Sequence, residues 1–129
     1  MRGCDLNHCQ AVESSFEHAT LIACNFGDCN LRNASFRGAN ISKSNFTGAM
    51  LSSVDMLRVV AKDCNFSKAR LQKADLREGD FENSNFTEAS LFEANLERAN
   101  LQQCNMTHTN LNLANLSMAR VGNSASIQQ

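Results

Sequence analysis

A large apolar residue recurs at every fifth position along this chain, from Leu6 to Val121, without an insertion or a deletion. Leu, Phe, Ile, Met or Val occupies all of these 24 positions except two, Ala11 and Ala61. The residue two places earlier is always Cys, Ala, Ser, Thr, Gly or Val, and the residue directly before is most often Asn, Asp or Ser. Each pentapeptide therefore has a small, a polar and a large position, followed by two free positions.

This period fits neither a regular helix nor a simple strand. On an α-helix, residues five apart are rotated by about 140°, so the apolar side chains would spread over the whole surface. A half-buried strand requires a period of two. A fixed short period kept along the whole chain is typical of a solenoid, in which stacked repeats bury a common core.

A second period of twenty residues indicates how the pentapeptides are arranged. Phe occupies positions 26, 46, 66 and 86, and Leu occupies positions 31, 51, 71, 91 and 111. Four pentapeptides therefore make one coil, and like side chains should stack between coils. The pattern predicts a domain over residues 4–121 with about six coils and a length of about 29 Å, at ~4.8 Å per coil. Residues 122–129 are expected to form a flexible tail.

The charged residues support a coil of twenty residues. Side chains twenty apart should lie above one another, where opposite charges stabilise by roughly 0.2–1 kcal/mol per pair. Only Asp55/Asp75 is a pair of like charges. Eight pairs of opposite charge are expected to meet: Glu17/Arg37, Lys43/Asp63, Arg58/Glu78, Lys62/Glu82, Lys68/Glu88, Lys73/Glu93, Arg77/Glu97 and Glu78/Arg98.

The pattern over Cys4 to Val121 resembles the pentapeptide repeat family, whose motif is A(D/N)LXX. The resemblance implies an all-β fold, a right-handed four-sided parallel β-helix known as the Rfr fold, with four pentapeptides per coil. The middle of the chain departs from the motif, and we expect a local bulge or a widened corner around Ser52–Ala61. The departures are Met50, Val60 and Arg70 at the polar position and Val54 and Val59 at the small position.

Titratable and nucleophilic residues show no arrangement typical of catalysis or of cofactor or metal binding. All six cysteines occupy the small inward position, which predicts reduced core residues. Cys9/Cys29, like Cys4/Cys24, would stack within disulfide range of their α-carbons, but parallel inward side chains are a poor geometry for the bond. The three histidines face water, and none joins the cysteines as a zinc ligand. We therefore predict no catalytic, cofactor-binding or metal-binding residue, and no enzyme.

Asn-x-Ser/Thr triplets recur at Asn45, Asn65 and Asn85 because the repeat generates them. A glycan acceptor belongs in an accessible loop of a secreted protein. Here the asparagines should form a ladder along one side, in which their amides hydrogen-bond between coils.

Charge and hydropathy exclude several classes of partner. The net charge is −1, so no overall field favours nucleic acid. We find no apolar run long enough to span a bilayer and no signal-peptide pattern, which predicts a cytoplasmic protein without a membrane partner.

Met1–Gly3 leads almost directly into a coil, and the open ends of a solenoid need to be covered. We therefore expect either a longer natural unit or an end-to-end homodimer.

Clustered apolar surface marks contact sites, and some apolar residues should face outward. The candidate partner-contact residues are Met50, Leu57, Val60, Phe92 and Leu113, and Val12, Ile22 and Met118 should also face water.

A rigid rod with flat sides suits a protein-interaction or scaffold module, whose protein partner the sequence does not identify. The alternative comes from the family resemblance, because some members mimic B-form DNA and bind DNA gyrase. A mimic 29 Å long would present on the order of 17 negative charges, whereas 13 acidic residues here are offset by 12 basic ones.

Overall fold

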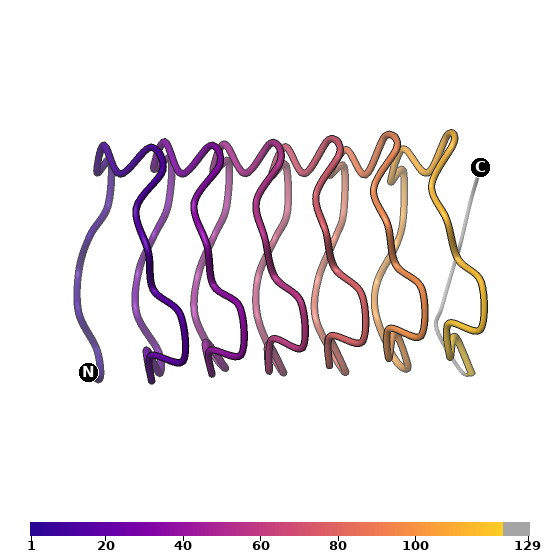
Figure 1. Cartoon of the computed structure of the whole chain (residues 1–129), viewed down its shortest axis with the longest axis horizontal. Helices are drawn as coiled ribbons and strands as arrows, with labels where there is room; N and C mark the ends of the chain where they lie inside the picture. Colours follow the sequence, from indigo (N-terminus) through magenta and orange to yellow (C-terminus); the bar gives the residue numbers. More distant parts are fainter. Residues whose placement is uncertain (123–129) are drawn as a thin grey trace.

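The computed structural model describes residues 1–122, over which the chain winds as a stack of coils from one end to the other (Figure 1). Residues twenty apart pair by parallel β-bridges at each polar position, from Asp5↔Asn25 to Asn100↔Arg120, and a further bridge joins Arg2 to Ile22. Each bridge is a single residue, so the described chain has neither a helix nor a longer strand. The twenty-residue coil is confirmed. Of the predicted tail, residues 123–129 lie outside the described range.

Every pentapeptide turns the chain at its two free positions. The carbonyl of the large residue accepts a hydrogen bond from the N–H three residues later, as from Ala99 to Leu96 at 3.0 Å, except at Leu21 and Ala61, where a serine hydroxyl of the next coil bridges the two groups. The second free residue has a positive φ close to +60° in every pentapeptide from His8 to Met118, whereas the first never does. Positive φ at the third residue of the turn alone defines a type II turn. Four such turns per coil produce the four flat sides.

Backbone hydrogen bonds join each coil to the next at three positions of every interior pentapeptide. Around Phe46 and Asn65 these bonds run from Phe46 N to Asn65 O at 2.7 Å and from Asn65 N to Ser44 O at 3.1 Å, and Gly48 N donates to Ser67 O at 3.0 Å. No buried side-chain nitrogen or oxygen among residues 1–122 lacks a partner. The backbone hydrogen bonds between coils therefore continue along the stack, and the buried polar side chains are also hydrogen-bonded.

Stacked phenylalanines form much of the core. Phe26, Phe46, Phe66 and Phe86 lie in one column, with neighbouring ring centroids 4.8–5.1 Å apart and nearly parallel planes. Phe36 meets both Phe26 and Phe46 edge-on at 5.9 Å. The predicted stacking of like side chains between coils is confirmed.

Polar residues at the small position are buried without strain because their hydroxyls reach a backbone carbonyl of the preceding coil. Ser44 Oγ donates to Leu21 O at 2.8 Å, and Ser84 Oγ donates to Ala61 O at 2.7 Å. Cysteines at this position make the corresponding bond, as from Cys64 Sγ to Ile41 O at 3.0 Å. Ser and Cys therefore donate the same bond to a carbonyl of the preceding coil, and Ser44 and Ser84 also accept the N–H of Cys24 and Cys64.

The expected asparagine ladder is present in part, because Asn25 and Asn45 bond between coils, whereas the side-chain amides of Asn65 and Asn85 make no such bond within residues 1–122. Asn45 Nδ2 donates to Asn25 Oδ1 at 3.1 Å, and Asn25 Nδ2 donates to Asp5 Oδ1 at 3.3 Å. Each Oδ1 also caps its own turn, since Asn65 accepts the Ser67 N–H and Asn85 accepts the Thr87 N–H at 2.9 Å. These asparagine side chains therefore have structural roles.

The prediction of a bulge around Ser52–Ala61 is wrong. The bridges Asp55↔Asp75 and Val60↔Asp80 continue the ladder in register, and the turn at Ser53 has the usual φ of 57°. Val54 and Val59 are buried at the small position with 1% exposure each, while Ala61 fills a large position in the same coil. The reduced volume at Ala61 offsets the added volume of the valines, so the backbone keeps its regular path.

Core residues are less covered in the first described coil and in the last one. Phe16 packs on Phe36 with a centroid distance of 4.8 Å, but it is only half-buried. The partly exposed inward residues are Cys4, Leu6, Cys9, Ala11, Phe16 and Ala19 in the first coil and Ala114, Leu116 and Ala119 in the last. Each of these coils has a neighbour on one side only within residues 1–122.

Candidate functional site

Three positions of each pentapeptide face outward, so the surface is a set of columns running along the stack. The polar residue lies on the flat side, and the two turn residues lie at the corner. We call one side the Leu side, defined by the pentapeptides centred on Leu31, Leu51, Leu71, Leu91 and Leu111. Because the ladder never slips, a residue's place in the pentapeptide fixes its column.

The structure does not bring the five predicted contact residues into one patch. Met50, Phe92 and Leu113 belong to the Leu side, whereas Leu57 and Val60 belong to the two sides that follow. Leu113 is 75% exposed, and Met50, Val60 and Phe92 are half-buried. Leu57 is buried, with 9% exposure, so the prediction that it faces outward is wrong.

Arg37 and Arg77 occupy the same column as Leu57, one coil before it and one coil after it. Arg37 Nη2 lies 2.9 Å from Asp55 Oδ2. Arg77 binds Asp75 through both fork nitrogens, Nε to Oδ1 at 2.8 Å and Nη2 to Oδ2 at 2.7 Å. Leu57 therefore lies in a column between two arginines that are both held in ion pairs. The like-charged pair Asp55/Asp75 is neutralised by the same two arginines.

The fork of Arg77 holds the pKa of Asp75 below its ordinary value, mainly through the side-chain hydrogen bond and against a smaller opposing effect of burial. The charged carboxylate therefore stabilises the fold above the ordinary aspartate pKa of about 3.9. This contribution is lost as the pH falls through the lower value of the folded state.

We expect Asp75→Asn to lower the free energy of unfolding at neutral pH by about 1 kcal/mol or less, because the pair is partly exposed to solvent. The difference from the wild type should shrink as the pH falls below about 4. Thermal melts between pH 7 and pH 2 measure this. Glu93→Gln is the control, since Glu93 makes no ion pair within residues 1–122, and it should leave the melting temperature unchanged. A difference between Asp75→Asn and wild type that is the same at both ends of the pH range would contradict the expectation.

Only two of the eight predicted charge pairs lie within ion-pair distance, Arg58–Glu78 at 3.5 Å and Lys62–Glu82 at 3.9 Å. The other lysines and arginines that form ion pairs bind carboxylates that are not twenty residues away, as Arg98 does with Glu97 at 3.2 Å. The prediction of eight stacked pairs is therefore largely wrong. Long side chains at the corners can reach either a flat-side carboxylate, as Arg37 reaches Asp55, or another corner carboxylate, as Arg98 reaches Glu97.

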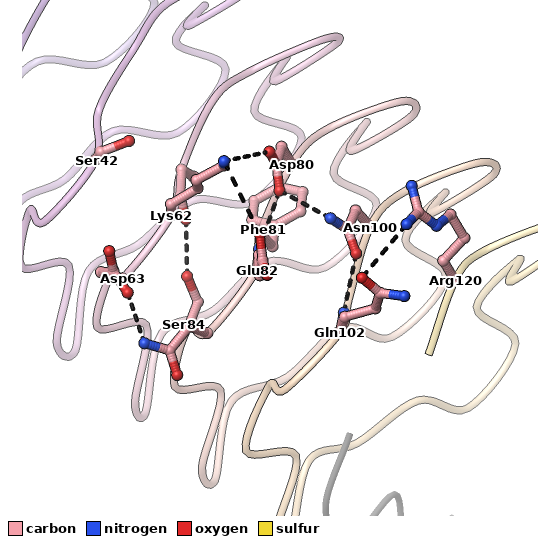
Figure 2. Close-up of polar contacts among 12 residues, drawn as sticks. Ser42, Lys62, Asp63, Asp80, Phe81, Glu82, Ser84, Asn100, Gln102 and Arg120 are labelled. Atoms are coloured by element: carbon pink, nitrogen blue, oxygen red, sulfur yellow. Dashed lines mark hydrogen bonds and ion pairs between the residues drawn. The ribbon is translucent and has the colours of Figure 1, made fainter. Parts of the chain in front are cut away.

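Figure 2 shows one side on which polar side chains join successive coils. Lys62 Nζ lies 3.5 Å from Asp80 Oδ2, and Asp80 Oδ1 accepts a hydrogen bond from Asn100 Nδ2 at 3.1 Å. Asn100 Oδ1 accepts the N–H of Gln102 at 3.1 Å, and Arg120 donates to Gln102 at 3.4 Å. The groups bind one another in a line, so this arrangement holds coils together.

The cysteines are free thiols, and burial raises the pKa of Cys64 to about 12 and that of Cys104 to about 11. Such thiols stay protonated at neutral pH, and a thiol must be deprotonated to act as a nucleophile or metal ligand. Within residues 1–122, no three His, Cys, Asp or Glu side chains gather as metal ligands, and no pocket is found. No helix in this range could cross a membrane.

Cys9 and Cys29 differ from the other cysteines because their sulfur atoms meet. The two Sγ atoms lie 2.7 Å apart, and Cys29 Sγ also donates to Leu6 O at 2.8 Å. The sequence placed these residues in adjacent coils but did not predict this contact. The sequence feature that could have indicated this contact is the spacing of twenty residues between two cysteines at the small position.

Family models match most of the chain. The model for a pentapeptide repeat region covers residues 1–76, and the model for pentapeptide repeats in eight copies covers residues 64–91 and 89–124. The chain therefore belongs to the pentapeptide repeat family. Among curated proteins, no sequence matches it.

Solved structures of the same family share the fold, a right-handed quadrilateral β-helix. HetL, a pentapeptide repeat protein involved in heterocyst differentiation regulation in the cyanobacterium Nostoc sp. strain PCC 7120, matches with a TM-score of 0.73 and 24% identity over 96% of this chain. The chain spans 64% of the length of HetL. Rfr23 from the cyanobacterium Cyanothece 51142 matches with a TM-score of 0.66 and 22% identity, over 95% of this chain and 88% of its own. QnrB1, a plasmid-mediated fluoroquinolone resistance protein, matches with a TM-score of 0.67 and 17% identity, over 95% of this chain and 73% of its own.

Proposed function

We propose that this chain is a non-enzymatic protein-interaction or scaffold module in the cytoplasm, which presents the flat sides of a rigid β-helix to a protein partner. The uninterrupted ladder and the satisfied buried polar groups support a rigid surface. The observation that carries the proposal is a pair of exposed apolar side chains, Leu113 and Met118, at 75% and 71% exposure.

Leu113 and Met118 occupy successive corners, where folding gives no reason for an apolar side chain. Both have positive φ, 60° and 58°, which costs a residue other than glycine roughly 1–2 kcal/mol. At every other described corner the second turn residue is polar, charged, glycine or alanine. Phe92 lies half-buried one coil earlier on the Leu side. Exposed apolar surface is typical of a protein contact site, and we place that site at these two corners.

We expect the double variant Leu113→Ser, Met118→Ser to weaken binding of the partner by about tenfold or more, because exposed apolar anchors carry much of the energy of an interface. The partner would be captured from the native cell, purified, and titrated against each variant. Glu93→Ser, Arg98→Ser is the matched control, since it changes the same two corners one coil earlier. Full binding by the Leu113/Met118 variant, with a normal circular dichroism spectrum, would contradict the proposal.

An end-to-end homodimer is the form of partnership that the last described coil fits. Backbone N–H groups of Leu111, Leu113 and Leu116 have no hydrogen-bond partner within residues 1–122. An unpaired row of such groups is a template for pairing with another chain. Sedimentation velocity distinguishes the cases: a second copy as partner requires a wild-type dimer that the Leu113/Met118 variant loses, and a wild-type monomer requires a different protein.

The alternative function is a DNA-mimicking protein that binds gyrase or a related topoisomerase, in the manner of a quinolone-protection protein. The likeness of the fold to QnrB1 favours it. The charge does not, since six of the 13 acidic residues already pair with a lysine or arginine: Asp55, Asp75, Glu78, Asp80, Glu82 and Glu97. Gyrase supercoiling and quinolone-protection assays discriminate, because only the alternative requires activity at low micromolar protein.

A further inference from the structure

The first two coils hold four of the six cysteines, and two of these are in contact. Cys9 Sγ lies 2.7 Å from Cys29 Sγ, and the Cys9 N–H also points at Cys29 Sγ, at 3.2 Å. The thiol proton of Cys29 is directed to Leu6 O at 2.8 Å. The lone pairs of Cys29 therefore face Cys9, which is the arrangement that a bond between the two sulfurs requires.

The ladder fixes this contact in register. The next residues pair through the Gln10↔Asn30 bridge, and Asn30 N donates to Cys9 O at 2.9 Å. Residues paired across adjacent coils have α-carbons about 4.8 Å apart, which is inside the range of 4.4–6.8 Å that a disulfide allows. The α-carbon separation therefore permits the bond, and the contact between the sulfur atoms shows that the two side chains turn toward each other, unlike the parallel arrangement expected from the sequence.

We propose that Cys9 and Cys29 form a reversible disulfide that fastens the first coil to the second. Exchange with a small-molecule disulfide such as oxidised glutathione supplies the oxidant. The Cys9 thiolate attacks one glutathione sulfur, so a Cys9–glutathione bond forms and one glutathione leaves as the thiolate. The Cys29 thiolate then attacks Cys9 Sγ and displaces the second glutathione. Two protein thiols are oxidised, and one glutathione disulfide is reduced to two thiols.

The order of the two steps follows from exposure. Cys9 is half-buried in the first coil, whereas Cys29 is buried. Burial raises the pKa of the Cys29 thiol to about 12, so it is the poorer first nucleophile. In the second step its small thiolate fraction is offset by its position beside the sulfur that it attacks.

The crosslink would join the second coil to a coil whose core is only partly covered within the described residues. The first coil has one neighbour within the described chain, and its inward residues are only partly covered. Coils of this kind open at a lower free energy than the centre of a solenoid. The disulfide would keep the first coil paired, and its reduction would let that coil open.

The test equilibrates the full chain in glutathione buffers of increasing oxidised fraction, blocks remaining thiols with N-ethylmaleimide in denaturant, and maps the products. Cleavage before aspartate and after glutamate isolates each of the four cysteines, with Cys9 in peptide 5–13 and Cys29 in peptide 28–54. We expect these two peptides to be linked in monomeric protein. Cys4 and Cys24 are the internal control, since they also stack twenty apart but make no sulfur contact with each other, and they should be alkylated.

Cys29→Ser provides the matched variant, because Ser44 and Ser84 show that a hydroxyl makes the same carbonyl bond at this position. It should accumulate the Cys9–glutathione adduct and should not melt at a higher temperature after oxidation. Oxidised wild type should melt at a higher temperature than reduced wild type, with slower hydrogen exchange at Leu6, which donates to Asn25 O. A linkage through Cys4 or Cys24, a linkage between two chains, or free Cys9 and Cys29 in the most oxidising buffer would each overturn the proposal.

Discussion

Replacing Phe66 by alanine is expected to lower the free energy of unfolding by about 3–5 kcal/mol. The ring is fully buried between Phe46 and Phe86, with centroid distances of 5.1 and 5.0 Å, and it meets Phe81 edge-on at 6.0 Å. Its loss removes apolar burial and leaves a cavity that the rigid backbone cannot close. Urea denaturation followed by circular dichroism measures the effect, since the chain has no Trp or Tyr to report by fluorescence.

Phe16→Ala is the matched control, because Phe16 stacks on one phenylalanine, Phe36, and is half-buried. Its cost should be about half that of Phe66→Ala, in proportion to the area that is buried. Coils in a solenoid contact only their neighbours, so the Phe66 cavity should also loosen the bonds between the two halves of the stack. Equal costs at the two positions would contradict a core that is stronger in the centre than at its ends.

The sequence predicted the fold well because a single register determines most of it. A large residue at every fifth position requires the chain to turn once in every five residues. Phe at 26, 46, 66 and 86 requires a coil of twenty residues. Once these periods are set, backbone pairing leaves no freedom to slip without exposing the core. The same register correctly placed the inward cysteines and the outward histidines in their columns.

Side-chain partners were harder to predict, because the register fixes the position of each α-carbon but not the direction in which a long side chain extends. Arg37 could reach Glu17 or Asp55 with similar ease, and exposed pairs differ by less than about 1 kcal/mol. It binds Asp55, 18 residues away, and not Glu17 at the expected spacing of 20. The burial of Leu57 was likewise not predicted, because its place in the pentapeptide indicated only that it begins at a corner.

The sequence period also did not predict how the core accommodates side-chain volume or how the thiols are oriented. The bulge expected around Ser52–Ala61 depended on judging Val54 and Val59 singly, whereas the core responds to the total volume of a coil, including Ala61. The contact between Cys9 and Cys29 depends on side-chain rotation, which a sequence period does not describe. Leu113 and Met118, by contrast, could be found from sequence, because they are the large apolar residues at the second turn position.

Proline at Asn65 should be among the most damaging single changes in the chain. The Asn65 N–H donates to Ser44 O at 3.1 Å, and the Asn65 side chain accepts the N–H of Ser67 at 2.9 Å. Asn65→Pro removes both bonds and leaves a carbonyl without its donor, so we expect a loss of about 3 kcal/mol or more. Denaturation in urea measures it, alongside a second proline variant two residues further on.

Ser67→Pro should be close to neutral, although it introduces the same ring two residues away. Ser67 is the second residue of a type II turn, a position where φ is near −60° and proline is common. Its N–H bonds only to the Asn65 side chain, so the loss is about 1 kcal/mol. A stiffer unfolded chain offsets about 0.4–1 kcal/mol of that. Equal destabilisation by the two prolines would contradict the turn type. A large loss at Asn65 alone would tie the stability of the β-helix to single backbone bonds between coils.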